Sequence, residues 1–539
     1  MQNLLVKAQN TILSAAFVLF VSSGANAALG LIKNRLLASK FGVSENLAIF
    51  YTADRIPNLV YSILVVGALS TIFIPIFTDE LKRNKERAYA VASTLINTML
   101  LFFALLCIVS WIFSTNIIAA LGVGQFNTQQ ILLGAQIMQI MLFSQLLLVA
   151  GSLVSSVLQS YKLFIVPALA PLAYNVGMVI GIIFLSGRYG IMGPAYGTLI
   201  GAMLHFAIQL PFLSISGFKY SLKLETENKV FEQIIKLAPP RVLSVLITNG
   251  LATINNSFAI LISAASVVYL KFGTQLETFP VTLFGASIAA ASLPTLSSEY
   301  DENNVSKFKQ TFLTSYYQMM FLVLPASTAF LILRVPIVRL VYGVSSFPWS
   351  ATVNTATILG VFTFSIFPQS AIYLITRAFY AIKDTATPVK VSLVTIFINI
   401  ALSLFFIRIM HWGVWSVALS YVLTSNLDMS LMLYYLGKKL GGFSFESLTL
   451  PTAKINLAAF LMSLTLYFPI KLMDKVIFDT THTFNLILLT GIATLSGGIT
   501  YLILTHLLKI PEVELFYKLL RKINVRKAKV QKTDIEALQ

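Results

Sequence analysis

The sequence predicts an all-α polytopic membrane protein, with about fourteen transmembrane helices arranged as two six-helix pseudo-repeats around a central cavity and two further C-terminal helices. Composition is the first observation behind this prediction, since 57% of the 539 residues are hydrophobic and only 11% are charged. Soluble proteins carry about 25% charged residues. The second observation is that apolar runs of roughly 20 residues, the length that crosses a bilayer, recur along almost the whole chain. They lack the period-two alternation of a membrane barrel.

A pattern that occurs twice is the third observation. The segment Gly67–Pro75 is similar to Gly285–Pro294. The segment Leu158–Pro167 is similar to Phe379–Pro388, and the two pairs of segments are separated by almost the same length of chain. Internal repeats of several spans that face each other across a central site are the usual construction of secondary transporters. The duplication therefore favours a carrier over an enzyme, and we expect its glycines and prolines to mark bends in the helices.

Hydropathy places the individual spans in chain order. The second span exceeds one crossing in length, so we expect it to tilt or bend around Pro57. The fourteen spans are expected near residues 11–33, 47–77, 89–113, 130–158, 163–186, 190–214, 235–265, 275–298, 309–333, 353–380, 386–410, 412–436, 452–473 and 484–508.

The spans predict five regions in the chain. These are a first repeat (1–215), a cytoplasmic linker (216–232), a second repeat (233–440), two additional transmembrane helices (441–509) and a basic amphipathic tail (510–539). Basic loops follow the even-numbered spans, which places these loops and both termini in the cytoplasm. We expect the tail to lie on anionic membrane lipid.

The rest of the composition excludes several classes of function. No nucleotide-binding, nucleophile-elbow or metal-ligand motif is present, and the four histidines lack ligand spacing. The single cysteine, Cys107, lies in an apolar run and cannot form an intramolecular disulfide. We therefore predict no cofactor, no metal and no enzymatic activity. The net charge of +17 is explained by cytoplasmic loops and the tail, and no basic-aromatic module indicates nucleic acid.

Polar residues inside the predicted spans are candidates for lining a cavity, because charges at membrane depth are costly. Each predicted repeat carries an arginine beside a helix-breaking proline, Arg55 near Pro57 and Arg241 after Pro240. This arrangement suits an anion site between the repeats. The alternatives are an ion pair that only joins helices, or a side chain that reaches the interface. Asn58, Ser244, Thr248 and Asn255 share helical faces with these arginines. The predicted substrate-binding cavity set consists of Arg55, Arg241, Lys33 at the end of span one, Asn58, Ser244, Thr248, Asn255 and Gln275.

A second polar face is expected on span ten. Gln369, Tyr373 and Arg377 recur at intervals of four residues and so share one side of a helix. Arg377 lies close to the cytoplasmic end, where it can bind a lipid headgroup or form part of a gate.

Several motifs resemble the MurJ (MviN) lipid II flippase family, a branch of the multidrug/oligosaccharidyl-lipid/polysaccharide exporter superfamily. The stretch Thr376–Val389 resembles the loop signature of this family. Further matches, in order along spans one to twelve, are Phe41-Gly42, Ile56–Leu59, Gly67–Ser70, Pro167–Pro171 with Asn175, Pro240–Leu243 and Leu293–Ser297. The chain resembles a divergent member of this family.

The resemblance implies a function and a substrate. It implies a flippase that moves undecaprenyl-pyrophosphate-linked peptidoglycan precursor (lipid II) from the inner to the outer leaflet of the bacterial cytoplasmic membrane by alternating access, acting as a monomer. The headgroup would pass through a central basic cavity, and the last two spans would supply a groove for the lipid tail. Bidentate arginine contacts suit a pyrophosphate.

The chain also departs from the family pattern at charged positions. Lys33-Asn34 stands where the family has Arg-Asp, and Ala27 and Gln275 stand where it has arginines. Acids and bases are missing together, which is electrostatically consistent because a lone buried charge is costly. Some relatives bind sodium through Asn and Asp one turn apart, but Ser403 follows Asn399 here, so no sodium site is predicted. The alternatives are a flippase for another polyprenyl-linked glycan, a drug/cation antiporter and a non-transporting membrane scaffold.

Overall fold

The computed structural model describes residues 12–64, 73–222, 246, 249–301, 304–443, 445–476 and 482–514. Within these ranges the regular structure is helical and no strand occurs. Ten helices in this part of the chain are long and apolar enough to cross a membrane. The predicted fold class, an all-α polytopic membrane protein, is therefore confirmed. The count of fourteen spans stays a prediction, because parts of several predicted spans lie outside the described residues.

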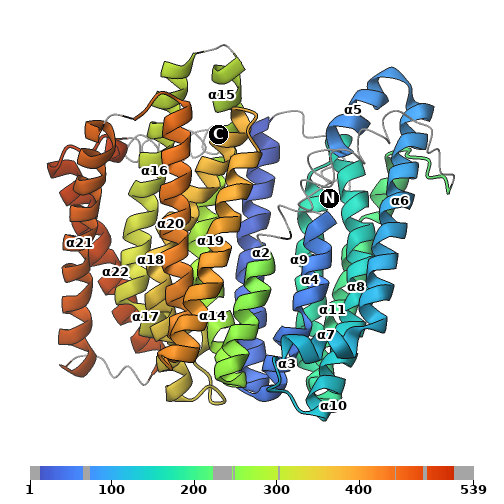
Figure 1. Cartoon of the computed structure of the whole chain (residues 1–539), viewed down its shortest axis with the longest axis horizontal. Coiled ribbons are helices and arrows are strands. Elements are labelled where there is room, and N and C mark those ends of the chain that lie inside the picture. Colours follow the sequence, from blue (N-terminus) through green and yellow to red (C-terminus); the bar gives the residue numbers. More distant parts are fainter. Residues whose placement is uncertain are drawn as a thin grey trace, which may run out of the picture. The chain divides into compact units, whose positions relative to one another are not determined.

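The described helices are labelled in chain order in Figure 1. The N-terminal helices are α2 (Ile12–Phe41), α3 (Glu45–Ala53), α4 (Arg55–Leu64), α5 (Ile74–Arg83), α6 (Lys85–Ile112), α7 (Ser114–Leu121), α8 (Thr128–Ser160), α9 (Ile165–Ile180), the π-helical segment η2 (Gly181–Leu185), α10 (Ser186–Tyr189), α11 (Met192–Ala207) and α12 (Leu210–Ile215). After an unlabelled helix over 249–262 come α14 (Ala264–Pro280), η3 (Val281–Ala286), α15 (Ser287–Asp301), α16 (Val305–Ile332), α17 (Arg334–Tyr342), α18 (Trp349–Ala381), α19 (Ala386–Leu404), η4 (Phe405–Ile409), α20 (Trp415–Lys439), α21 (Phe445–Val476) and α22 (Thr483–Leu507).

The chain forms two compact units. As far as their residues are described, the first unit holds Met1–Gln275, Val341–Ile358 and Ser392–Ser420, and the second holds Leu276–Leu340, Leu359–Val391 and Tyr421–Gln539.

Helix α8 is the central helix of the first unit. It packs against α6, α9 and α11 and against the shorter α3, α4 and α7. Its most apolar window is 67% buried, whereas that of α6 is only 22% buried. An apolar helix that leaves most of its surface uncovered is suited to contact with lipid. Helix α8 is therefore an interior helix, and α6 is suited to face lipid.

Helix α9 and the π-helical segment η2 pack against α11 through glycines. A Cβ added to Gly177 would lie 2.3 Å from the Cα of Gly201, and a Cβ added to Gly181 would lie 2.3 Å from the Cα of Gly197. Small residues let two helix backbones approach closely in a membrane, where packing rather than the hydrophobic effect holds helices together. The contact requires glycine at these positions.

The second predicted span is interrupted at Asp54. Helix α3 ends at Ala53 and α4 begins at Arg55. Pro57 has no backbone N–H to bond the carbonyl of Ala53, and its ring would clash with that carbonyl in a continuous helix. The helix is thus interrupted at Asp54, three residues before the proline around which the sequence predicts a bend.

The core of the second unit joins α16, α18, α21 and α22. Its buried side chains include Phe308, Phe312 and Met319 from α16 and Phe379 from α18. Tyr501 of α22 donates a hydrogen bond to the backbone oxygen of Phe321 at 2.9 Å. Helices α21 and α22 run side by side in Figure 1 and contact each other along their length.

Several helices recur at the spacing of the sequence repeat. Helices α6 and α16 are both 28 residues long, and they begin at Lys85 and Val305, each after an asparagine N-cap. Helices α8 and α18 are both 33 residues long, and they begin at Thr128 and Trp349, so the second pair has nearly the same offset as the first. Each helix of the second pair is followed by a lysine with positive φ, 61° at Lys162 and 60° at Lys383. The boundaries of the two repeats remain predictions.

Three details of the sequence prediction are wrong. The residues 266–274, expected between spans seven and eight, lie inside α14, and the break falls at Ser263. Helix α2 continues to Phe41, so Lys33 lies about two turns before its end and not at its end. Pro167 and Pro388 lie in the first turns of α9 and α19 instead of bending helices, because the first turn needs no N–H donor there.

Candidate functional site

A cationic cluster lies in the first unit. It comprises Lys33 of α2, Arg55 of α4 and Lys271 of α14, around the carboxylate of Asp54 at the break between α3 and α4. The carboxylate interacts electrostatically with all three cations. All four side chains are partly buried. Among the residues that the structure describes, none of the three cations is close enough to Asp54 for an ion pair.

Arg55 is held by a hydrogen-bond chain. Its Nε donates to Oδ1 of Asn256 at 3.2 Å. Asn256 in turn donates from Nδ2 to the hydroxyl of Thr52 at 3.1 Å. Asn256 is 1% exposed and Thr52 is fully buried, so water does not reach these hydrogen bonds. This contact uses only Nε of the Arg55 guanidinium. No described residue forms a hydrogen bond with the two terminal nitrogens of Arg55.

Lys271 is the residue of this cluster that the sequence analysis missed. Its Nζ lies 5.6 Å from the centre of the Tyr51 ring. The next residue, Phe272, stacks on Tyr342 at 4.2 Å and lies 6.2 Å from Tyr51. These aromatic contacts fix the turn of α14 that carries the lysine. A lysine one helical turn before Gln275 was the available signal, but it was placed in a loop.

The cluster carries an excess of positive charge. Three cations surround one carboxylate, and Asp54 also accepts a hydrogen bond from Nδ2 of Asn58 at 2.5 Å. The alternative of an Asp54–Arg55 ion pair that merely joins helices is not realised in the described structure. A half-buried group of cations with too few acids is suited to binding an anion.

The other predicted cavity residues have different positions. Asn58 is exposed beside Asp54, and Gln275 is half-buried one turn after Lys271. Asn255 is 8% exposed, but its neighbour Asn256 makes the contact with Arg55. Arg241, Ser244 and Thr248 lie outside the described residues.

The second predicted face lies on α18 of the second unit. Gln369 donates from Nε2 to the hydroxyl of Ser425 on α20 at 2.7 Å. Tyr373 is 44% exposed, and Arg377 lies one turn before the end of α18 and interacts electrostatically with Tyr373. The three residues share one face, as predicted, but Gln369 is engaged in joining two helices.

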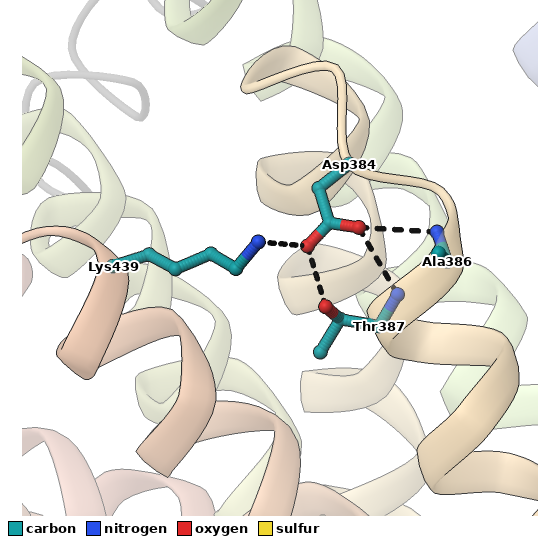
Figure 2. Close-up of polar contacts among 4 residues, drawn as sticks. All are labelled: Asp384, Ala386, Thr387 and Lys439. Carbon is teal, nitrogen blue, oxygen red and sulfur yellow. Dashed lines mark hydrogen bonds and ion pairs between the residues drawn. The ribbon is translucent and has the colours of Figure 1, made fainter.

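The signature loop after α18 is closed by a carboxylate (Figure 2). Asp384 accepts hydrogen bonds from the backbone N–H groups of Ala386 at 3.1 Å and Thr387 at 3.0 Å. It also accepts from the Thr387 hydroxyl at 2.5 Å and pairs with Lys439 Nζ at 2.6 Å. Burial alone would raise the pKa of this carboxyl, but the bonds from Lys439 and Thr387 outweigh burial and lower the pKa to about 2. The loop therefore fixes the start of α19 against the end of α20.

Comparison with solved structures identifies the same fold. A structure described as "Lipid II flippase MurJ, inward closed conformation" covers 94% of this chain and 99% of its own, with a TM-score of 0.76 and 24% identity. An inward-facing multidrug resistance MATE family transporter of the MOP superfamily matches with a TM-score of 0.66 and 15% identity over 77% of this chain and 94% of its own.

Sequence comparisons extend over most of the chain. The probable lipid II flippase MurJ of Buchnera aphidicola subsp. Acyrthosiphon pisum is 26% identical over 499 residues, which are 91% of this chain and 96% of the relative. The lipid II flippase MurJ of Burkholderia cenocepacia is 23% identical over 68% of this chain and 72% of its own length. The model of the family "Lipid II flippase MurJ" matches residues 37–488. The chain therefore belongs to the lipid II flippase MurJ family.

Proposed function

We propose that this protein moves undecaprenyl-pyrophosphate-linked peptidoglycan precursor, lipid II, from the inner to the outer leaflet of the bacterial cytoplasmic membrane. The observation that carries the proposal is the cationic cluster of Lys33, Arg55 and Lys271 around a single carboxylate. Family membership supplies the substrate class, and the cluster supplies groups that bind its pyrophosphate.

The chemistry of the cluster suits a pyrophosphate. Partly buried cations are costly when unpaired, and an incoming anion compensates them. Arg55 keeps its terminal guanidinium nitrogens available, which can hold two phosphate oxygens at once. The ammonium groups of Lys33 and Lys271 act as point charges and adapt to an anion that changes position. Gln275 offers a neutral donor where the family pattern has an arginine, and Lys271 restores one positive charge a turn away.

The transport mechanism that we propose is alternating access between two repeats, 1–215 and 233–440. The recurrence of α6 and α8 as α16 and α18 supports it, because duplicated bundles of this kind move against each other in secondary transporters. We further propose that the protein works as a monomer without catalysis, that both termini are cytoplasmic, and that the tail 510–539 lies on anionic lipid.

The function is tested by rescue of a bacterium depleted of its own lipid II flippase. The wild-type chain should restore growth and the amount of lipid II that an externally added headgroup-cleaving enzyme reaches. Arg55→Ala should restore neither at equal membrane abundance, and Arg241→Ala is expected to behave alike. Arg188→Ala is the matched control, because Arg188 is exposed on α10, and it should rescue fully.

Each outcome has a separate meaning. Rescue by Arg55→Ala would refute the anion site. Failure of the abundant wild-type protein would refute lipid II as substrate, and the lipid-linked saccharide that copurifies would then identify another polyprenyl-linked glycan. Absence of any such lipid, together with failed rescue, would favour a membrane scaffold.

A further inference from the structure

A buried carboxylate lies in the second unit and does not belong to the cationic cluster. Glu277 of α14 is 2% exposed and lies within the candidate membrane span Ala264–Tyr300. Its carboxylate accepts a hydrogen bond from the Ser365 hydroxyl of α18 at 3.1 Å and a weak one from the Thr278 hydroxyl at 3.5 Å. Among the described residues it has no cationic partner.

The titratable groups that face Glu277 are neutral or acidic. Tyr373 of α18 and Tyr421 of α20 interact electrostatically with its carboxylate. Beyond them, Asp428 interacts with Tyr421 and Arg377 interacts with Tyr373. The only cation in this set, Arg377, interacts with Tyr373 and forms no ion pair with Glu277.

An ionised carboxylate in these surroundings is unstable. Burial of a charge without a counter-charge costs several kcal/mol, so the group becomes neutral or acquires a cation. Two hydroxyl donors, one of them at the limit of hydrogen bonding, compensate only part of this cost. Glu277 is therefore poised to gain and lose a proton when its surroundings open and close.

A polar strip connects this carboxylate with the end of α18. Ser365, Gln369, Tyr373 and Arg377 recur every four residues on one helix face. Gln369 bonds to Ser425, which lies one turn after Tyr421 on α20. The strip runs from the fully buried Ser365 to Tyr373, which is 44% exposed. Hydroxyl and amide groups in such a row can pass a proton, with water filling the gaps.

The helix that carries Glu277 is interrupted one turn after it. Pro280 ends the regular part of α14, and the π-helical segment η3 follows over Val281–Ala286. Within η3, a Cβ added to Gly285 would lie 2.6 Å from the Cβ of Ser370. Proline and π-helical turns allow a helix to bend, and they are frequent at functional sites in membrane proteins. A change of charge at Glu277 thus acts on a helix that is able to move.

We propose that Glu277 is a proton-binding residue. Its carboxylate takes up a proton in the closed state and releases it along the strip Ser365–Arg377 when the strip is hydrated, so that proton movement drives the conformational cycle. The proton is added to and removed from the carboxylate oxygen, and no other bond changes. The coupling to lipid movement rests on the proposed function, whereas the proton binding does not.

Proton binding is measured directly on the purified full-length protein by infrared difference spectroscopy. Lowering the pH should produce a protonated-carboxyl band that shifts in D2O, is missing in Glu277→Gln and is retained in Glu299→Gln. Glu299 is the matched control because it is also buried, at 3% exposure, and accepts a hydrogen bond from Thr311. Ser365→Ala removes a donor that stabilises the ionised form, so the band should appear at a higher pH than in the wild type.

Coupling is measured in proteoliposomes at zero membrane potential. The rate of lipid II translocation by the wild type should change when the sign of an imposed pH gradient is reversed. Glu277→Gln should lose this dependence, and Glu299→Gln should keep it. Should Glu277→Gln fail to fold, Glu277→Asp retains the carboxyl and should keep the band and the gradient response.

Three results would overturn the proposal. A titrating band that persists in Glu277→Gln shows that another group binds the proton. A band that responds to sodium and not to pH shows a metal-cation site instead. If the Glu277 band titrates but translocation by the wild type does not depend on the pH gradient, proton binding is not coupled to translocation. A wild type that translocates no lipid II refutes the proposed function, and the infrared titration still decides proton binding.

Discussion

In the cationic cluster, a shift of one position along a helix decides which side chain makes a contact. Asn255 has the predicted helical spacing to Arg241, yet Asn256 holds Arg55. Adjacent residues on a helix point about 100° apart, so spacing alone does not decide which of two asparagines faces a given neighbour. Lys271 was missed for a related reason, because Lys271 and Gly273 fall between two predicted spans and their position inside α14 is seen only in the folded chain.

Replacement of Lys271 tests whether the positive charge of this side chain contributes to translocation. Lys271→Ala should lower the rate of lipid II translocation about tenfold or more, because a charge-assisted hydrogen bond contributes about 1.5–3 kcal/mol. Lys271→Arg should retain most of the rate. The measurement is externally accessible lipid II per unit time at equal abundance. Lys390→Ala, an exposed lysine of α19, is the control, and an equal loss in that variant would contradict a specific role.

At the scale of elements, helix ends and close contacts decide the architecture. Prolines of the repeat fit in the first turns of α9 and α19 because the first turn of a helix leaves its N–H groups without partners inside the helix. The aspartate before α19 then supplies the missing acceptor for the backbone. Glycines give α9 and α11 their close approach.

The Asp384 contacts predict a pH-dependent stability. Asp384→Asn should lower the free energy of unfolding by about 1 kcal/mol, since it weakens a helix cap. The folded-state pKa of about 2 is below the ordinary value of about 3.9, so the stabilisation is present above that ordinary value. It should disappear as the pH falls towards 2. Unfolding temperatures in detergent at neutral and acidic pH measure this difference.

A control for Asp384 is available in the chain. Asp79 pairs with Lys82 at 3.8 Å, and their side chains are 69% and 74% exposed. Asp79→Asn should leave the unfolding temperature almost unchanged, because exposed ion pairs contribute little. An Asp384→Asn variant with the same stability as Asp79→Asn would show that the loop is held by other contacts.

Replacement of Gly177 by alanine should create a packing defect between α9 and α11. Gly177→Ala would place a methyl group 2.3 Å from the Gly201 backbone, so α9 and α11 must move apart at a cost of about 1–3 kcal/mol. Gly187→Ala on α10 has no atom within 4 Å of its added Cβ and should be tolerated. Thermal unfolding of both variants measures the effect, and equal stability would contradict the close contact.

At the scale of the whole molecule, charge distribution sets the orientation that we propose. Basic residues follow the even-numbered predicted spans, and such residues stay in the cytoplasm. The exposed Gln125, between α7 and α8, should then face outward, whereas the exposed Lys85, at the start of α6, should face the cytoplasm.

Cysteine labelling tests this orientation. In a Cys107→Ser background, a membrane-impermeant thiol reagent added to intact cells should label Gln125→Cys and not Lys85→Cys. Both should react after the membrane is opened. The opposite pattern would reverse the topology and with it the proposed direction of transport.

Local sequence was sufficient for the class of protein and the family, because hydropathy, span length and short motifs are properties of neighbouring residues. Contacts between distant residues were decided only by the folded chain. Arg55 meets Asn256 across 201 residues, and Glu277 meets Ser365 across 88 residues. No pattern in the local sequence predicts either contact. The break at Asp54, the helical setting of Lys271 and the absence of a described cation beside Glu277 all follow from how helices pack, which the spacing of residues along the chain does not encode.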